Sequence, residues 1–452
     1  MNLEECLPSV IEGEDGVELE TAVADHYEGR HQRLEEKNKA AVERFLGKGQ
    51  RVHEVGIVPR YYGELLTWAL KRYMGEKGWQ VAQTLGYRGR EPVYIDVNTN
   101  YEQRENVLMD GQMLVKRGSS RLIVTVDINL RWRNSVLVEG VASIKKEVRE
   151  FVVGVLTTAR EQNFYRGKKL EFSRRLRFLD LKQRSWDSII LDEGIKKEIK
   201  ANTIGFLARR EHWAKYGIPS KRGVLLAGEP GTGKTIICKA LMGEADGLTC
   251  ITTSAYAIDV NEYINELYQL AEDLSPCLVF IEDIDLVGQN REEFGYQRGP
   301  ALLSLLSALD GIEEKNGVVT IATTNCLETI DKALSERPSR FDRVIKLCRP
   351  RLEQRRQMVS RLCQRITLDE ALQEYVACKT DGCTPAQIQE VIYSLVIENP
   401  EEKSTVATFS EHAIDHIISR MNGKNGHRLG FCTSSGSNGR KPDLVKSLSE
   451  SP

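Results

Sequence analysis

Hydrophobic and polar positions change their period several times along this chain, and the changes divide it into regions. Apolar residues recur at three-to-four spacing within residues 61–82, which predicts an amphipathic helix. Four runs then alternate apolar and polar residues and predict strands, at 91–98, 106–117, 120–132 and 135–142. A second helical pattern covers residues 144–163. Residues 46–182 are therefore expected to form a separate α+β domain.

A different pattern begins after residue 182, where continuous apolar runs alternate with helical segments. The strand-like runs are 223–228, 249–255, 277–285 and 318–325, and the helical patterns between them are 235–245, 264–274 and 301–312. Uninterrupted apolar strands between helices indicate a parallel sheet that is covered on both faces. We therefore expect an α/β domain over residues 183–350. Helical patterns alone follow, which predicts a small helical domain over residues 351–421.

The two ends of the chain have the composition of weakly structured segments. Residues 1–45 are acidic and then mixed in charge, so they are expected to be partly disordered or to form one helix. Residues 422–452 are rich in Gly, Ser and Asn and are expected to be disordered.

The strand-like run at 223–228 leads into a glycine-rich turn, GEPGTGKT, which fits the pattern G-x-x-x-x-G-K-[ST]. Glycines allow backbone N–H groups to turn toward an anion, and the following helix adds the partial positive charge of its N-terminus. Lys234 can then reach the β and γ phosphates of a nucleotide, and the Thr235 hydroxyl can bind Mg²⁺. The residues expected to surround the phosphates are Glu229, Pro230, Gly231, Thr232, Gly233, Lys234 and Thr235.

Polar side chains also end two further strands of the predicted sheet. Glu282 and Asp283 follow an apolar run, at the carboxyl end of a strand, where ligands bind in open α/β sheets. Asn325 follows the next strand-like run, and its amide could orient the attacking water or contact the γ-phosphate. Asn is common at turns, so this last assignment depends on the neighbouring motifs.

The composition narrows the class of protein. The chain has 452 residues, of which 41% are hydrophobic and 28% charged, as in an ordinary protein of two or three domains. A net charge of -2 gives no global field that would attract nucleic acid or an anionic membrane. No apolar run reaches the roughly 18 residues of a membrane span, and the acidic N-terminus argues against a secretory signal or transit peptide. Ten scattered cysteines without a C-x-x-C pair indicate reduced thiols, so we expect a cytoplasmic protein.

Together the motifs resemble those of AAA ATPases. GEPGTGKT, PCLVFIEDID, LLSALDGI, TIATTN and ERPSRFDR stand in that family's order and spacing, and the resemblance covers residues 186–421. The segments before the phosphate loop are most similar to the branch that contains the mitochondrial translocase of the Rieske iron–sulfur protein, whose acidic pair also reads Glu-Asp. Because no membrane segment is predicted, the mitochondrial role of that branch is not expected to transfer.

The resemblance implies ATP and Mg²⁺ as cofactors and a ring of subunits, usually a hexamer and in that branch sometimes a heptamer. Arg337 and Arg340 match the arginine fingers, which reach the γ-phosphate of the neighbouring subunit; the planar, permanently charged Arg suits phosphate oxygens. Asn325 matches the sensor 1 residue. The residues that match the surroundings of the adenine base are Ile189, Ile190, Thr384 and Ala386.

Two departures from the family pattern leave questions open. Glu282 and Asp283 stand in the reverse order of most members, and their position implies that Glu282 serves Mg²⁺ while Asp283 polarises water. Because Asp is shorter by a methylene, this division of roles stays open. The aromatic–hydrophobic–glycine pore loop of threading members is not recognisable; Tyr256 or Tyr263 could replace it, although a core or helix-face tyrosine is the simpler interpretation.

We therefore expect a ring-forming ATPase that remodels, unfolds or translocates a protein substrate, with the domain at 46–182 binding a substrate or an adaptor. One alternative is a nucleic-acid remodeller, which the near-neutral charge disfavours. Another is a nucleotide-gated scaffold without hydrolysis, which the complete set of Lys, acids, Asn and Arg disfavours. His412 and His416 have the spacing of metal ligands on a helix, but no third ligand accompanies them, so an ordinary helix face is favoured.

Overall fold

The computed structural model describes residues 16–128, 134–173, 175–181, 185–254, 261–286, 317–327, 341–366, 368–398 and 409–421. The chain divides into two compact units. The first comprises Met1–Ile189, Glu193–Gly228 and Lys234–Lys346, and the second comprises Ile190–Asp192, Glu229–Gly233 and Leu347–Pro452. In the described ranges, no helix has both the length and the apolar character that crossing a bilayer requires.

The first unit begins with helix α1 (Gly16–Leu46) and a six-stranded antiparallel sheet in the order β1-β6-β5-β4-β2, in which β3 pairs with β4. The strands are β1 (Arg51–Val58), β2 (Gln80–Leu85), β3 (Val93–Asn98), β4 (Arg104–Arg117), β5 (Ser120–Ile128) and β6 (Asn134–Val141). The helices are η2 (Arg60–Tyr62), α2 (Gly63–Glu76), η3 (Ala142–Ile144) and α3 (Lys145–Glu161).

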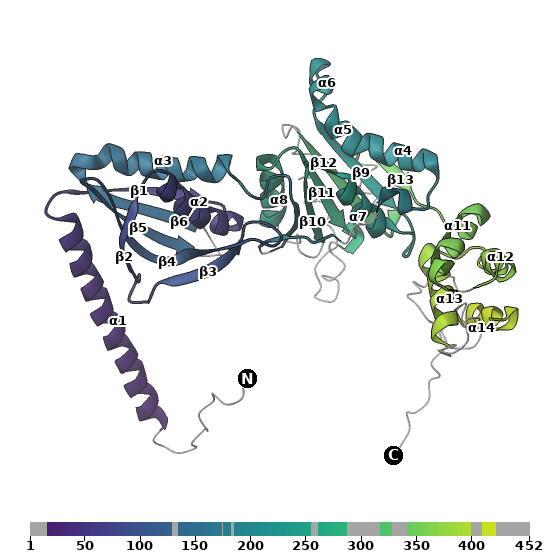
Figure 1. The fold of residues 1–452 in the computed structure, drawn as a ribbon, viewed down its shortest axis with the longest axis horizontal. Helices are drawn as coiled ribbons and strands as arrows, with labels where there is room; N and C mark the ends of the chain where they lie inside the picture. The colour runs from purple at the N-terminus through teal and green to yellow at the C-terminus, as the bar shows by residue number, and fades with distance from the viewer. Residues whose placement is uncertain are drawn as a thin grey trace, which may run out of the picture. The chain divides into compact units, whose positions relative to one another are not determined.

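The antiparallel sheet is packed on both faces, because successive side chains of a strand point to opposite sides. Helices α2 and α3 cover one face (Figure 1), where Leu122 and Val124 of β5 are fully buried. Ile123 points to the other face and packs with Leu114 against Phe45, near the end of α1. This arrangement agrees with the α+β character expected from the alternating runs.

The helix predicted within residues 61–82 is correct only in its first part. It ends at Glu76, and the residues from Gln80 to Leu85 form β2 instead. Gly78 has a φ of 70°, a left-handed conformation that glycine adopts without steric cost, and the chain turns there from helix to strand.

The second sheet of this unit has seven strands in the order β13-β9-β12-β11-β10-β7-β8 and is parallel except for the β7–β8 pair. Its strands are β7 (Lys169–Phe172), β8 (Leu176–Phe178), β9 (Lys221–Ala227), β10 (Thr249–Ser254), β11 (Cys277–Glu282), β12 (Val318–Thr324) and β13 (Arg343–Lys346). The helices are η4 (Trp186–Ser188), α4 (Glu193–Asn202), α5 (Ile204–Ala208), α6 (Arg210–Lys215), α7 (Lys234–Glu244), α8 (Asn261–Asp273) and η6 (Ile284–Leu286). Every residue of β12 is buried, and the predicted α/β architecture with a parallel sheet is confirmed.

Strands β7 and β8 lie before residue 182, where the sequence places the domain boundary, yet they extend the parallel sheet. β7 pairs with β10 so that Leu170 lies opposite Ile251. Lys169 anchors the pairing, because its Nζ donates to the carbonyl of Leu248 at 3.1 Å. The parallel sheet therefore includes residues that the sequence assigned to the preceding domain.

Helix α8 connects the two sheets through a shared core. Tyr61, Tyr62 and Leu65 are buried in one cluster with Leu267 and Tyr268 of α8. At the start of α8, the Arg60 guanidinium donates to a Glu266 carboxylate oxygen at 2.7 Å and lies 3.9 Å from the centre of the Tyr263 ring. Tyr263 is thus a partly buried residue of this joint, which is the simpler of the two interpretations of this tyrosine.

The second unit contains a small helical bundle, with α11 (Leu352–Leu362), η9 (Cys363–Arg365), α12 (Glu370–Lys379), α13 (Pro385–Ile397) and α14 (Glu411–Met421). Its core includes Val359, Val376, Ile388 and Ile414, which α11, α12, α13 and α14 contribute in turn. The short segment Glu229–Gly233 of the glycine-rich turn belongs to this unit.

Candidate nucleotide site

Three neighbouring strands of the parallel sheet bring polar residues to one edge. β9, β12 and β11 are adjacent, with Ala227 paired to Thr324 and Ala322 paired to Ile281. A polar or glycine residue stands at the end of each strand or directly after it, so Gly228, Asn325 and Glu282–Asp283 come to the same carboxyl edge. Ligands bind at this edge in open α/β sheets.

Lys234 begins helix α7 and is almost entirely buried, with 6% of its surface exposed. Its ammonium group donates to the carbonyl of Gly228 at 2.6 Å, across the glycine-rich turn. Burial lowers the pKa of Lys234, while the nearby Asp283 and Asp285 act in the opposite direction. A cation is therefore held at the place where the sequence pattern puts the phosphates.

Thr235 and Glu282 bring two side-chain oxygens close together. The Thr235 hydroxyl lies 3.5 Å from the Glu282 carboxylate, within hydrogen-bond range. Burial raises the pKa of Glu282, and Lys239 partly offsets that effect. A half-buried carboxylate beside a hydroxyl suits a hard cation, which prefers oxygen ligands. These two residues therefore fit the expected Mg²⁺.

Asp283 has an unusual backbone conformation, with a φ of 53°. Few residues other than glycine adopt this left-handed region, but Asp and Asn tolerate it. Its backbone N–H donates to the Thr323 hydroxyl at 2.9 Å, and its carboxylate accepts a hydrogen bond from the Asn325 side-chain amide at 3.1 Å. The reversed acidic pair thus has two environments, since Glu282 faces Thr235 and Asp283 faces Asn325.

The sequence interpretation missed two residues that support this edge. Asp285 is buried, and its carboxylate accepts the backbone N–H of Asn325 at 3.0 Å, which fixes the start of that loop. Thr323 holds the backbone of Asp283 through its hydroxyl. Asp285 stands in the run IEDID and could have been noticed there, whereas a threonine in a buried strand carries no recognisable signal.

In the second unit, the middle of the glycine-rich turn lies against the start of α13. Gly231 has a φ of 82°, and a Cβ atom there would approach both Ala386 and the Thr384 hydroxyl to 2.9 Å. The Ala386 N–H donates to the Gly231 carbonyl at 3.2 Å. Glycine is therefore required at position 231, because the backbone is left-handed there and there is no room for a Cβ atom. Thr384 and Ala386, which were expected near the base, contact the turn directly.

Thr384 also determines where α13 begins. Its hydroxyl accepts the backbone N–H of Gln387, and the Gln387 side chain accepts the N–H of Thr384 at 2.8 Å. This reciprocal pair is a capping box, which satisfies two of the N–H groups that a helix start leaves unpaired.

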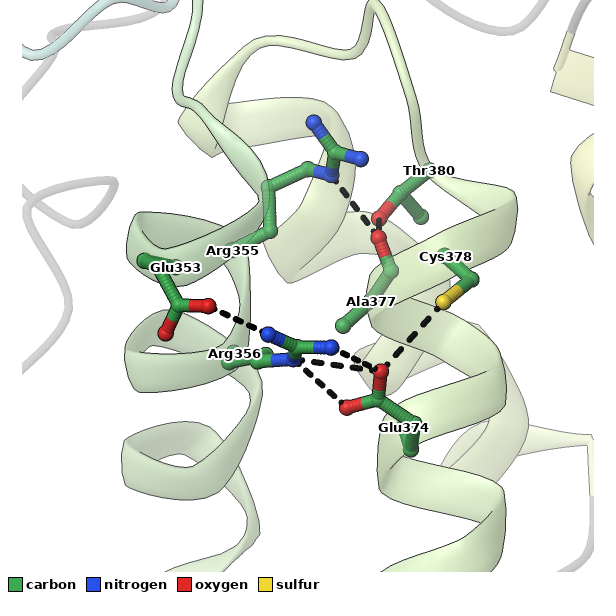
Figure 2. Close-up of polar contacts among 7 residues, drawn as sticks. All are labelled: Glu353, Arg355, Arg356, Glu374, Ala377, Cys378 and Thr380. Atoms are coloured by element: carbon green, nitrogen blue, oxygen red, sulfur yellow. Dashed lines mark hydrogen bonds and ion pairs between the residues drawn. The ribbon is translucent and has the colours of Figure 1, made fainter.

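Arg349 contacts the same turn and was not predicted as a site residue. Its Nε and Nη2 donate to one carboxylate oxygen of Glu229 at 3.0 and 2.6 Å, and its Nη1 donates to the Gly382 carbonyl at 2.7 Å. The segment before α13 is itself held by α11 and α12. Figure 2 shows Arg355 donating to the Ala377 carbonyl, and Arg356 forming a forked pair with Glu374.

The other predicted residues fall into three groups. Ile189 is buried in the first unit behind η4, and Ile190 belongs to the second unit. Pro230 is exposed in the turn, Gly233 has a φ of 97°, and the Thr232 hydroxyl donates to the Glu229 carbonyl at 2.8 Å. Residues outside the described ranges are Arg337, Arg340 and Tyr256.

Comparison with known proteins finds relatives over half of the chain. It is 32% identical over 248 residues to the ATP-dependent zinc metalloprotease FtsH of Mesomycoplasma conjunctivae, covering 51% of this chain and 32% of the relative. It is 33% identical over 240 residues to FtsH of Acidothermus cellulolyticus, covering 50% of this chain and 36% of that relative. It is 32% identical over 255 residues to FtsH 2 of Sphaerobacter thermophilus, covering 52% of this chain and 37% of that relative. The chain therefore spans about a third of the length of the curated relatives it matches.

These relatives are named as zinc proteases, but the present sequence lacks the matching motif. It contains no H-E-x-x-H, in which two His on one helix face bind zinc and the Glu acts as general base. Among the residues that the structure describes, no three His, Cys, Asp or Glu side chains are grouped to hold a metal ion, and this includes the surroundings of His412 and His416 on α14.

A family profile also matches the region of the candidate site. Residues 224–349 match the ATPase family associated with various cellular activities (AAA). The matched segment begins in β9 and includes the glycine-rich turn, the acidic pair and Asn325. The predicted resemblance is confirmed at the level of the family, while the particular branch stays a prediction. Residues 224–349, which contain the candidate site, therefore match the AAA family.

Proposed function

We propose that the chain binds Mg²⁺ and ATP at the carboxyl edge of β9, β11 and β12, and that water attacks the γ-phosphorus there, so that the bond to the β-phosphate breaks and ADP and phosphate are released. The observation that supports this most directly is the convergence there of Lys234, Thr235, Glu282, Asp283 and Asn325 within one unit. A cation, two oxygen ligands, a second carboxylate and an amide are the groups that phosphoryl transfer to water requires.

Each residue has a separate role in the proposed reaction. Lys234 neutralises phosphate charge, and the buried position of its ammonium group strengthens that interaction. Mg²⁺ held by Thr235 and Glu282 would neutralise the charge that develops on the phosphate oxygens. Asp283 accepts a proton from the attacking water, and Asn325, which donates to Asp283, keeps that carboxylate oriented. Catalysis then rests mainly on positioning and electrostatics.

Replacing Asp283 by Asn is expected to slow hydrolysis by about 10²- to 10⁴-fold, the usual contribution of a general base, while ATP still binds. Asn tolerates the left-handed backbone at this position, so the variant removes the charge and keeps the fold.

Glu282→Gln is expected to raise the Mg²⁺ concentration needed for half-maximal activity. Steady-state ATPase assays over a Mg²⁺ series measure both effects. Parental rates in both variants would exclude IEDID as the catalytic acidic motif.

We also propose a ring of subunits in which Arg337 and Arg340 act on the neighbouring site, because the AAA relatives and the motif ERPSRFDR support this arrangement. Activity per subunit should then rise with protein concentration, and Arg337→Ala should lower turnover by about 10³-fold or more without loss of ATP binding. Mixing Arg337→Ala with Lys234→Ala chains, each inactive alone, should restore activity after subunit exchange. Activity that is independent of concentration, with no recovery on mixing, would place these arginines in cis or outside the reaction.

A protein is the proposed substrate. The printed names of the relatives describe ATP-dependent proteases, and this supports a protein as the substrate that is remodelled or unfolded. The α+β domain, which contacts α8 of the ATPase part, is the proposed binding site for the substrate or an adaptor. A cytoplasmic location stays a prediction. Retention of a partner on an Asp283→Asn chain with ATP, and its release by hydrolysis in the parent, is the test of this role.

A further inference from the structure

Glu229 places a negative charge in the loop that the proposed function assigns to a polyanion. It is the first residue after Gly228 in the pattern G-x-x-x-x-G-K-[ST], whose backbone N–H groups surround the phosphates. A carboxylate at this position repels a nucleotide unless its charge is balanced or its side chain is held away. The structure contains a group that can do both.

That group is the guanidinium of Arg349. Two of its nitrogens donate to the same Glu229 oxygen at 3.0 and 2.6 Å, and the third donates to the Gly382 carbonyl at 2.7 Å. Arg is always protonated, so this balance of charge persists at every relevant pH. Because all three nitrogens are engaged, the Glu229 side chain is held toward the segment that precedes α13.

The backbone of the turn is held by the same part of the unit. The Gly231 carbonyl accepts the Ala386 N–H, and Gly231 packs too closely on Thr384 and Ala386 to admit a Cβ atom. The position of Glu229 therefore follows from contacts on either side of it. The Glu229–Arg349 pair is about half exposed, and such pairs contribute little to folding stability. Its effect is therefore expected on the binding of an anion near the turn.

We propose that Arg349 is a positioning residue for nucleotide binding, which neutralises Glu229 and keeps its carboxylate turned toward Gly382. This proposal rests on the proposed function, since it names a determinant of affinity at that site. Arg349→Ala leaves an unbalanced carboxylate beside the phosphates and is expected to weaken ATP binding about 3- to 10-fold at low salt, and ADP binding less. The loss should shrink as salt is raised, because the pair is exposed.

The decisive variant is the double substitution. Adding Glu229→Ala to Arg349→Ala removes the unbalanced charge and should recover most of the lost affinity, whereas a purely structural role for Arg349 predicts no recovery. Glu229→Ala alone should bind ATP about 2- to 3-fold more tightly, since Arg349 is then free to attract phosphate. Titration of fluorescent ATP and ADP analogues at two salt concentrations measures all three variants in the full chain.

Arg356→Ala is a matched control. Arg356 also binds a carboxylate through its Nε and Nη2, which contact both oxygens of Glu374 inside the helical bundle (Figure 2). Its hydrogen-bond partners in the described part of the chain, Glu353 and Glu374, lie in α11 and α12 and not in the glycine-rich turn. Its replacement should leave ATP affinity within about 2-fold of the parent. An Arg349→Ala chain with parental affinity, or a double variant without recovery, overturns the proposal while nucleotide binding by the parent still stands. Failure of the parent itself to bind nucleotide overturns the proposed function and this inference together.

Discussion

Replacing Lys234 by alanine is expected to weaken ATP binding by about 10- to 150-fold, because a hydrogen bond to a charged partner contributes about 1.5–3 kcal/mol. The ammonium group is buried and already lies against the Gly228 carbonyl, so it needs little reorganisation to meet a phosphate. Asp283 and Asp285 lie nearby, and without the lysine their negative charges act unopposed on the nucleotide. Isothermal titration calorimetry with ATP and Mg²⁺ measures the change.

Two controls separate binding from folding in this experiment. Circular dichroism should show that the Lys234→Ala chain keeps its secondary structure. Lys197→Ala, which removes an exposed lysine from α4, should leave the affinity unchanged. If Lys234→Ala binds ATP nearly as tightly as the parent, the glycine-rich turn is not the phosphate site.

A chain that begins at Ser185, just after the boundary expected from the sequence, is expected to lose most of the stability of the ATPase part. It lacks β7 and β8 and the tyrosines that cover α8. The buried side chains lost with β7, β8 and the turn before them are Tyr165, Leu170, Phe172 and Leu176. At about 1.5–3 kcal/mol each, these represent about 6–12 kcal/mol, which is comparable with the whole stability of a typical domain. Soluble yield and thermal unfolding measure the effect.

A chain that begins at Asn163 provides the comparison, since it keeps β7 and β8 but loses the preceding sheet. It should be more soluble than the Ser185 chain and unfold at a higher temperature. Its unfolding temperature should still be lower than that of the full chain, because it lacks Arg60, Tyr61 and Leu65, which pack on α8. A Ser185 chain with the melting temperature of the full chain would show that β7 and β8 are dispensable for the parallel sheet.

Much of the candidate site was predictable because its signals are local in the sequence. A buried strand, a glycine-rich turn and a helix start follow one another at 221–244, so the position of Lys234 depends only on neighbouring residues. Glu282 and Asn325 end apolar runs, and the carboxyl ends of parallel strands meet at one edge. The convergence of these residues was therefore a consequence of the sheet type.

Other features depended on contacts between distant segments. The pairing of Asp283 with Asn325 follows from β11 lying beside β12, and the left-handed backbone of Asp283 has no sequence signature beyond the tolerance of Asp for it. Arg349 lies 120 positions from Glu229, and its selection of that carboxylate could not be read from charge alone in a chain with 65 acidic residues.

The sequence by itself determined the α+β character of the first region, the α/β character of the second, the AAA motifs and the residue types at the phosphate edge, because periodicity and turn chemistry act over a few residues. Only the tertiary structure decided which sheet each short strand joined. The four residues of β7 alternate between buried and less buried positions, as in many short strands, and Leu170 and Phe172 are buried in the core shared with β10 and α8 rather than in the core of the preceding sheet. Burial of those side chains depends on the assembled core, and the sequence of a short strand does not determine which neighbouring strand it pairs with.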